Sequence, residues 1–440
     1  MSTSVTRERE ATLFRFATAG SVDDGKSTLV GRLLHDTKGI LADQLAQIAR
    51  TSAERGFSHG EFDFALLTDG LRAEREQGIT IDVAYRYLAT EARNFILADC
   101  PGHVQYTRNM VTGAATADAV IVLVDARRGV AEQTRRHLAV ASLLRVPHVI
   151  VAVNKIDLID FDESAFRAIE AEAHRVAASL GLDALHVLPV SALDGDNIVE
   201  VSPRTPWHDG PALLELLETL PTATAHDLAP FRLPVQTVIR PQGGLAPEYA
   251  NSADDAEHLR DYRGFAGRVA SGGIAVGDRV DVFPGAWQTT VTSIRVAGAE
   301  ASTARAGQSV AVTLADEFDA ARGAVIAQAG TLPPGLREAE VELFQLDART
   351  LHSGDRVLIK HGTATVQGVV SEVFSRRDLD TLGHTPATAL AVNEIGRVRL
   401  RFAAELPLEP YALNREAGAL LVIHPVDGAT LAAATVISAD

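Results

Sequence analysis

The chain has 440 residues, of which 46% are hydrophobic and 22% are charged, and its formal net charge is −16. This length predicts two to four domains, and no apolar run is long enough to span a bilayer. The excess of acidic residues argues against a broad nucleic-acid-binding surface. The polar residues 1–10 do not resemble a signal peptide, and the single cysteine excludes an internal disulfide. We therefore expect a cytoplasmic protein that binds neither membranes nor nucleic acid.

Up to about Leu220, short apolar segments alternate with amphipathic ones. The apolar segments predict buried strands at residues 14–19, 95–98, 119–124, 148–153 and 186–190. The amphipathic segments predict helices at residues 27–34, 105–113, 132–144, 163–180 and 211–218. This alternation is typical of an α/β domain with a doubly wound, mostly parallel sheet.

The pattern changes after a small, polar linker at residues 222–229. Beyond it, short alternating segments separated by Gly, Asp and Pro predict two antiparallel β-barrels, divided where Pro333-Pro334-Gly335 breaks the pattern. The tetrapeptide Gly277-Asp278-Arg279-Val280 recurs as Gly354-Asp355-Arg356-Val357, which fits two similar hairpins. The predicted domains are therefore residues 1–225 (α/β), 229–330 (β-barrel) and 335–440 (β-barrel).

A complete Walker A loop lies between the first predicted strand and helix. Gly20 and Gly25 allow the backbone to turn its N–H groups toward phosphates, Lys26 supplies a positive charge, and the Ser27 hydroxyl can bind Mg²⁺. The positive end of the following helix adds to this anion site. The nucleotide-binding residues that we predict here are Gly20, Ser21, Val22, Asp23, Asp24, Gly25, Lys26, Ser27 and Thr28.

Two further elements fit the phosphate end of the same site. Asp99 ends the predicted strand at 95–98 and can hold Mg²⁺ through water, while the Gly102 N–H can bond the γ-phosphate. Thr80, in Gly78-Ile79-Thr80, can add a second hydroxyl to the metal when its segment is ordered by the triphosphate. The predicted metal ligands are Ser27, Thr80 and Asp99.

The base end of the site is predicted from Asn154-Lys155-x-Asp157, which follows the strand at 148–153. The Asp157 carboxylate can accept two hydrogen bonds from guanine, whereas adenine lacks both donors. Lys155 can cover the base, and Asn154 can tie this loop to the Walker A loop. Ser191-Ala192-Leu193 follows the next strand, where a backbone N–H could meet guanine O6. The α/β domain is therefore predicted to be a P-loop GTPase domain that uses GTP and Mg²⁺.

The four motifs, followed by two barrel-like segments, resemble the translational GTPase superfamily typified by elongation factor Tu. Within it, the chain resembles one branch, the GTP-binding large subunit of bacterial sulfate adenylyltransferase. This closer resemblance is carried by residues 22–28, 65–87, 105–114, 261–267 and 393–400. It implies a subunit that couples GTP hydrolysis to the formation of adenosine 5′-phosphosulfate and pyrophosphate from ATP and sulfate, in sulfate assimilation and cysteine biosynthesis.

The resemblance also implies residue roles and a partner. The family's hydrolytic histidine matches His103, which would orient the attacking water, and Lys26 and Thr80 would complete the catalytic set. In this family, ATP and sulfate are handled by a separate small subunit, so we expect a heterodimer or a higher assembly. The chain has no pyrophosphate-binding loop, and no second Walker A loop follows Asp157, so we expect no fused kinase domain.

Some positions depart from the wider pattern, and two other functions stay open. Asp24 replaces the histidine that is usual in translation factors, Cys100 replaces a threonine common in the branch, and the acidic loop 241–260 is long. We interpret Cys100 as a small filler rather than a redox switch. The main alternative is an elongation factor that carries aminoacyl-tRNA, which has the same fold. A regulatory GTPase that acts only through partner binding is the other.

Overall fold

The computed structural model describes residues 13–37, 64, 83–102, 107–182, 184–222, 229–241, 262–285, 287–379 and 381–438. These residues belong to two compact units, the first formed by 1–223 with 378–383 and the second by 224–377 with 384–440. Three parts of the predicted site and its surroundings lie outside the described residues, namely Thr80, His103 and most of the loop 241–260.

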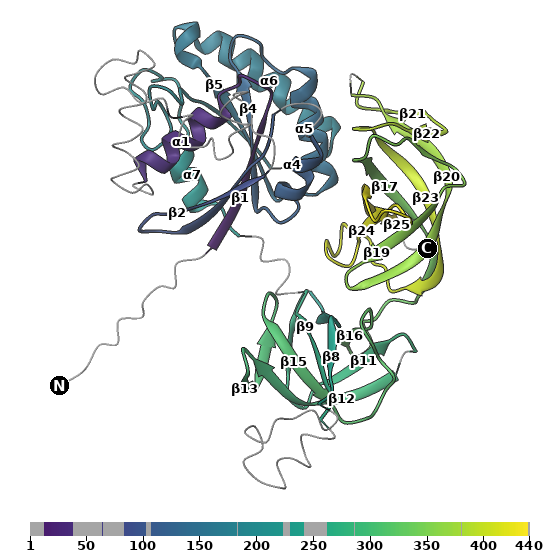
Figure 1. Cartoon of the computed structure of the whole chain (residues 1–440). Helices are drawn as coiled ribbons and strands as arrows, with labels where there is room; N and C mark the ends of the chain where they lie inside the picture. The colour runs from purple at the N-terminus through teal and green to yellow at the C-terminus, as the bar shows by residue number, and fades with distance from the viewer. Residues whose placement is uncertain are drawn as a thin grey trace, which may run out of the picture. The chain divides into compact units, whose positions relative to one another are not determined.

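The first unit is a six-stranded sheet with helices on both faces (Figure 1). The strand order is β2-β3-β1-β4-β5-β6, and only β2 runs antiparallel to its neighbour. The strands are β1 (Leu13–Gly20), β2 (Ala84–Ala89), β3 (Asn94–Asp99), β4 (Ala119–Asp125), β5 (His148–Asn154) and β6 (Leu185–Pro189). The helices are α1 (Lys26–Asp36), α4 (Thr107–Ala114), α5 (Glu132–Leu143), η3 (Ile156–Ile159, a 3₁₀ turn), α6 (Glu163–Ser179) and α7 (Leu213–Thr219). The predicted doubly wound, mostly parallel sheet is confirmed.

The burial of each strand explains which strands could be predicted from the sequence. All seven residues of β4 are buried, and so are six of the seven in β5, as expected for central strands covered on both faces. Strand β2 was not predicted from the sequence. It lies at the edge of the sheet, and only Leu88 among its six residues is fully buried, so it lacks an apolar run.

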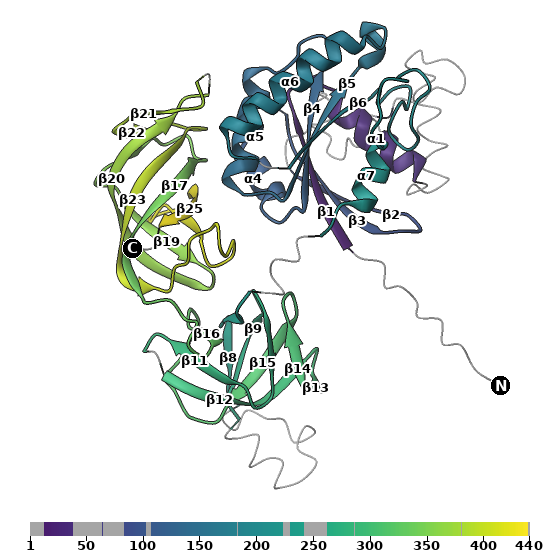
Figure 2. The ribbon, with the colours of Figure 1, turned by 180° about the vertical axis from the view of Figure 1, so that it is seen from behind.

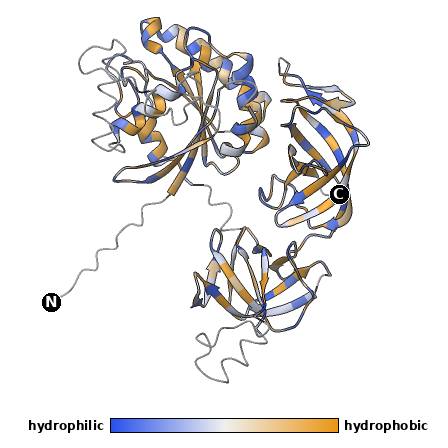
Figure 3. Ribbon diagram, viewed as in Figure 1, coloured by the Kyte–Doolittle hydropathy of each residue, from blue (hydrophilic) through white to orange (hydrophobic). Residues whose placement is uncertain are grey.

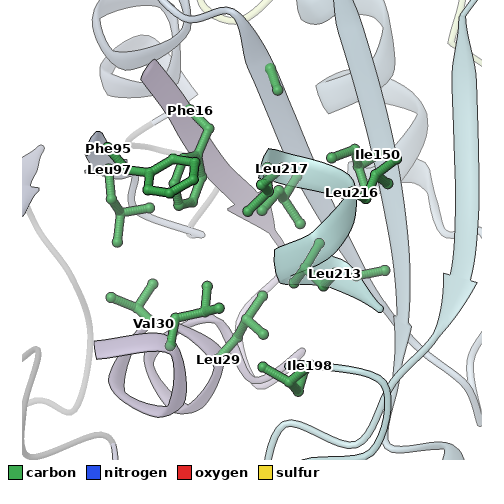
Figure 4. Packing of buried hydrophobic residues seen from close by; sticks show 14 of the residues in the cluster. Phe16, Leu29, Val30, Phe95, Leu97, Ile150, Ile198, Leu213, Leu216 and Leu217 are labelled. Atoms are coloured by element: carbon green, nitrogen blue, oxygen red, sulfur yellow. The ribbon is translucent and has the colours of Figure 1, made fainter. Parts of the chain in front are cut away.

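One face of the sheet is covered by α1 and α7, and the other by α4, α5 and α6 (Figures 1 and 2). Between the sheet and the first pair of helices, the aromatic rings of β1 and β3 meet the leucines of α1 and α7 (Figure 4). Arg93 anchors the end of α7 to this layer, because its guanidinium donates to the carbonyls of Leu217 and Leu220 and lies 4.9 Å from the Phe14 ring centroid. The Walker A loop is thereby carried between a rigid strand and a packed helix.

The second unit consists of antiparallel strands in two large sheets, each with its own buried core, and in two short pairs, β10 with β14 and β18 with β22. The first sheet has the order β7-β16-β11-β12-β15-β9-β8, with β13 beside β12, and the second has β19-β24-β25-β17-β23-β20-β21, closed by a pairing of β19 with β20. The strands of the first part are β7 (Arg232–Pro234), β8 (Thr237–Ile239), β9 (Gly264–Arg268), β10 (Gly273–Ala275), β11 (Arg279–Phe283), β12 (Trp287–Val296), β13 (Ala299–Ala301), β14 (Thr303–Arg305), β15 (Ser309–Leu314) and β16 (Val325–Gln328). Those of the second part are β17 (Leu336–Gln345), β18 (Leu351–His352), β19 (Arg356–His361), β20 (Ala364–Arg377), β21 (His384–Pro386), β22 (Ala389–Leu390), β23 (Ile395–Leu406), β24 (Ala419–Ile423) and β25 (Thr430–Ser438).

The barrel strands alternate between buried and exposed residues, which appears as alternating orange and blue bands in Figure 3. The repeated tetrapeptide forms the same turn twice. Gly277 and Gly354 have φ values of 93° and 95°, and the carboxylates of Asp278 and Asp355 each accept a backbone N–H at 2.8 Å. A positive φ favours glycine, so the repeat reflects one turn geometry used in both sheets.

Among the described helices, none combines the length and the apolar character needed to cross a membrane.

Cys100, the single cysteine, is fully buried after β3, with its Sγ 3.7 Å from the Ala98 carbonyl oxygen. Burial raises the pKa of its thiol well above the ordinary value, and the charge of Asp99 adds to this. Because the thiolate is the reactive form, alkylation of the native protein by iodoacetamide at pH 8 should be at least about 10²-fold slower than alkylation of the urea-unfolded chain. Mass spectrometry after timed quenching measures both rates. Equal rates would contradict the assignment of Cys100 as a packing residue.

Candidate nucleotide-binding site

The Walker A loop connects β1 to α1 in a conformation that depends on residues with positive φ. Gly20, Asp23 and Gly25 have φ values of 152°, 68° and 91°. A side chain at position 25 would also be blocked, because an added Cβ would lie 2.4 Å from Nδ2 of Asn154. Helix α1 begins directly afterwards at Lys26. The loop therefore takes the tight turn that the glycine spacing predicted, with a helix N-terminus at its end.

Lys26 is a buried cation at the centre of this loop. Its Nζ donates to the carbonyl oxygens of Gly20 and Ser21, each at 2.9 Å. Burial lowers the pKa of its ammonium, although the nearby charges of Asp99 and Asp24 oppose this shift. A polyphosphate would supply compensating charge to this ammonium, so the loop fits an anionic ligand.

Asp24 closes the loop from within. Its Oδ2 accepts the Ser21 N–H at 2.6 Å, and the side chain is almost fully buried. Burial raises the pKa of this carboxyl group, and the hydrogen bond from Ser21 opposes the shift. Asp24 thus shapes the loop from inside and does not face outward as a ligand side chain would.

The segment after β3 packs directly against the Walker A loop. Asp99 is buried, and its Oδ1 accepts the hydroxyl of Thr18, its register partner on β1, at 2.8 Å. Gly102 lies so close to the loop that an added Cβ would be 2.0 Å from Lys26 Nζ and 2.6 Å from the Gly20 oxygen. The structure therefore brings together Lys26, Asp99 and Gly102, which were predicted to form the phosphate end of the site.

The Asn154 side chain joins three loops at the ends of the parallel strands. Its Nδ2 donates to the Asp24 carbonyl at 2.8 Å, and its Oδ1 accepts the Ala192 N–H at 2.9 Å. The predicted tie to the Walker A loop is therefore present in the structure. The Ala192 N–H is thus engaged, and the Ser191 N–H donates to the Asp196 carbonyl, so among these three residues Leu193 has the N–H that bonds to no other described residue.

A second set of contacts at this end was not predicted from the sequence. Asp125 ends β4 with 1% of its side chain exposed, and its Oδ2 lies 3.1 Å from Lys155 Nζ. Arg127 holds the same carboxylate through its Nε at 3.0 Å and its Nη2 at 2.6 Å. The hydrogen bonds from Arg127 hold the pKa of Asp125 well below its usual range. The only sequence signal was a carboxylate that directly follows an apolar strand.

Lys155 connects these contacts to the Walker A loop, because its Nζ also donates to the Asp23 carbonyl. Its backbone is left-handed, with φ at 64°, and this turn starts the 3₁₀ segment that carries Asp157. Asp157 is half-buried, and Leu193 is exposed. The remaining predicted loop residues, Val22, Ser27 and Thr28, lie at the surface or are half-buried.

The described part of the site thus has two ends with different chemistry. A buried ammonium and a turn of glycines suit a polyphosphate, and a cluster of Asp157, Lys155 and Asn154 lies at the neighbouring strand end. Within the described residues, no group of three His, Cys, Asp or Glu side chains could hold a metal alone. The hydroxyl and carboxylate of Ser27 and Asp99 fit a Mg²⁺ that takes its other ligands from phosphates and water.

Comparison with known proteins decides the family. The family model of the elongation factor Tu GTP binding domain matches residues 11–225, and the GTP-eEF1A C-terminal domain-like family matches residues 338–437. The bifunctional enzyme CysN/CysC of Mycobacterium tuberculosis is 47% identical over 428 residues, which are 97% of this chain and 67% of that protein. Sulfate adenylyltransferase subunit 1 of Laribacter hongkongensis is 45% identical over 435 residues, which are 99% and 87% of the two chains. The chain belongs to the sulfate adenylyltransferase subunit 1 family.

A crystal structure of sup35 with GDP is 20% identical, with a TM-score of 0.43, and covers 100% of this chain and 97% of that one. The sequence relatives confirm the resemblance to the sulfate adenylyltransferase branch and the GTP-binding domain at its N-terminal end.

For this member of the sulfate adenylyltransferase subunit 1 family, Asp125→Asn tests the contacts of Lys155. The amide keeps the shape of the carboxylate but loses the charge that holds the Lys155 ammonium. We expect the affinity for GDP and GTP to fall about tenfold, which corresponds to the loss of about one charge-assisted hydrogen bond. Titration with a fluorescent guanine nucleotide measures the change.

Asp162→Asn is the matched control for this substitution. Asp162 caps α6 by accepting the N–H groups of Ser164 and Ala165, and asparagine caps helices equally well. This variant should bind nucleotide like the wild type and melt at the same temperature. If Asp125→Asn also binds nucleotide within twofold of wild type, Asp125 has no role in positioning Lys155.

Proposed function

We propose that this chain is the GTP-hydrolysing subunit of a sulfate adenylyltransferase and couples GTP hydrolysis to the formation of adenosine 5′-phosphosulfate and pyrophosphate from ATP and sulfate. The observation that carries the proposal is the match to sulfate adenylyltransferase subunit 1 over nearly the full chain. The site agrees with it, because in this chain the Walker A loop lies beside Asn154 and Lys155. The fold alone would not separate this function from translation, because the two share it.

In this proposal, Lys26 exchanges its bonds to the Gly20 and Ser21 carbonyls for the β- and γ-phosphates of GTP. The Gly102 N–H reports whether the γ-phosphate is present, and the Asp157 carboxylate selects guanine. Ser27, Thr80 and Asp99 would hold Mg²⁺, which neutralises charge on the phosphates when bound.

The name subunit 1 implies a partner subunit for the relatives. For this chain we propose a small subunit that binds ATP and sulfate, in a heterodimer or a higher assembly. Formation of the phosphate–sulfate anhydride is uphill, so GTP hydrolysis has to share conformational states with it. Such coupling requires the GTP and GDP states to differ in their affinity for states of the partner.

The coupled reaction can be tested with a nucleotide that only an altered chain accepts. Asp157→Asn should lose at least about tenfold in GTP affinity, because each charge-assisted bond to guanine is worth about 1.5–3 kcal/mol. Its amide can instead donate to the extra carbonyl of xanthine. With the small subunit, ATP and sulfate present, this variant should raise the yield of adenosine 5′-phosphosulfate when given xanthosine triphosphate.

The controls are wild-type protein with xanthosine triphosphate and either protein with a non-hydrolysable analogue, which should give no excess product. Product is measured by chromatography after ATP, sulfate and pyrophosphate have reached a steady ratio. Equal yields with and without the hydrolysable nucleotide would reject energy coupling. Tight GTP-dependent binding of aminoacyl-tRNA would assign the chain to translation.

His103→Ala tests the proposed hydrolytic residue. A group that orients the attacking water contributes about 10²-fold or more, so partner-stimulated GTP turnover should fall by that factor. The affinity for GTP should stay within a few-fold of the wild-type value, because His103 is not assigned to nucleotide binding. Unchanged stimulated turnover in single-turnover phosphate-release assays would remove His103 from the mechanism.

A further inference from the structure

A second surface feature lies in the other unit, beside strand β8. An open depression of about 570 Å³ is lined by the residues 236–238 and 240, by Arg263, and by the segment 319–322. Next to the depression, the chain before β8 is hydrogen-bonded to the chain after the segment 319–322. The Val235 N–H donates to the Ala324 carbonyl, and the Gly323 N–H donates to the Val235 carbonyl. Beyond Val235, the described parts of these segments are joined only by a hydrogen bond from the Arg322 side chain to the Gln236 carbonyl, at 3.3 Å. The depression is therefore an opening between β8 and the segment 319–322.

Three arginines, Arg240, Arg263 and Arg322, face this opening. None of them forms an ion pair with another described residue, and the Arg263 Nε is buried without a hydrogen-bond partner there. The Arg263 guanidinium lies 5.4 Å from the Phe265 ring centroid, which holds it in place. Burial lowers the pKa of Arg263, and the positive charge of Arg240 adds to this effect. The carboxylates of Asp319 and Glu317 oppose this shift, so the three arginines face two acidic side chains on a chain whose net charge is −16.

Strand β8 also has an edge at the same place that no other described strand pairs with. It is the last strand in its sheet, and within the described part of the chain it pairs with β9 alone. Ile239 on this strand is 41% exposed. An edge strand offers backbone N–H and C=O groups to an added strand, and alternate side chains of that strand then meet the flanking surface.

We propose that this depression binds an extended acidic segment of a partner protein, which adds as a strand to this edge of β8 and places its carboxylates against Arg240, Arg263 and Arg322. A carboxylate partner suits arginine, whose planar group can form two parallel hydrogen bonds with it. Nucleic acid suits the depression less well, because its described lining residues include no aromatic side chain for base stacking.

The probe is a fluorescein-labelled peptide of about nine residues that alternates glutamate and threonine, long enough for one strand. Two companion peptides carry lysine in place of glutamate, or N-methyl groups on alternate backbone nitrogens. With the full chain, fluorescence anisotropy should show the glutamate peptide binding at least about tenfold more tightly than either companion. Its binding should weaken as ionic strength rises.

Arg240→Gln and Arg322→Gln should each weaken binding of the glutamate peptide by about fivefold or more. Both side chains are exposed, so these changes spare the core. Arg305→Gln removes an exposed arginine from β14 of the same barrel, outside the depression, and should leave binding unchanged. All three variants should keep the wild-type affinity for GTP.

Five results would overturn the proposal. Equal binding of the glutamate and lysine peptides, or equal loss in the Arg305 control, would remove the role of the arginines. Undiminished binding of the N-methylated peptide would remove strand addition. Tighter binding of a single-stranded oligonucleotide would assign the depression to nucleic acid. Binding that is seen only after deletion of residues 243–259 would make this chain's own acidic segment the occupant.

Discussion

The side-chain amide of Asn154 is the contact on which the nucleotide site depends. It joins the Walker A loop to the loop after β6, and both of its polar atoms are used while only 2% of the residue is exposed. A buried polar group that loses its partner costs about 1–3 kcal/mol, so the two loops are held together strongly. This is possible because parallel strands bring β1, β5 and β6 to one edge of the sheet with their carboxyl ends together.

The same edge balances two buried charges of opposite sign. Lys26 is surrounded by backbone oxygens and by the nearby charges of Asp99 and Asp24, and Asp125 is held by Arg127 and Lys155. The Lys26 ammonium would therefore be stabilised further by a bound polyanion, whereas the Asp125 carboxylate is already paired with cations. The phosphate end is therefore where ligand charge changes the balance, and the base end is arranged before a ligand arrives.

The sequence predicted the parts of the fold that depend on local pattern. The strands of the first unit fall within about one residue of their predicted ends, because each is an apolar run, and the Gly277 and Gly354 turns followed from their repeated residues. Strand β2 was missed because its polar, alternating residues lie at an edge. The contacts of Asp125 and the position of β8 at the end of its described sheet depend on tertiary neighbours, and no spacing in the chain records them.

The two sheets of the second unit are joined by a buried ion pair, which limits how they can move. Arg232 on β7 is 5% exposed and donates to Glu409, which follows β23, at 2.9 Å, and to Thr331 between the sheets. Removing one partner of such a pair costs about 3–5 kcal/mol, because the other charge stays buried alone. This pair therefore stabilises one arrangement of the two large sheets within the second unit.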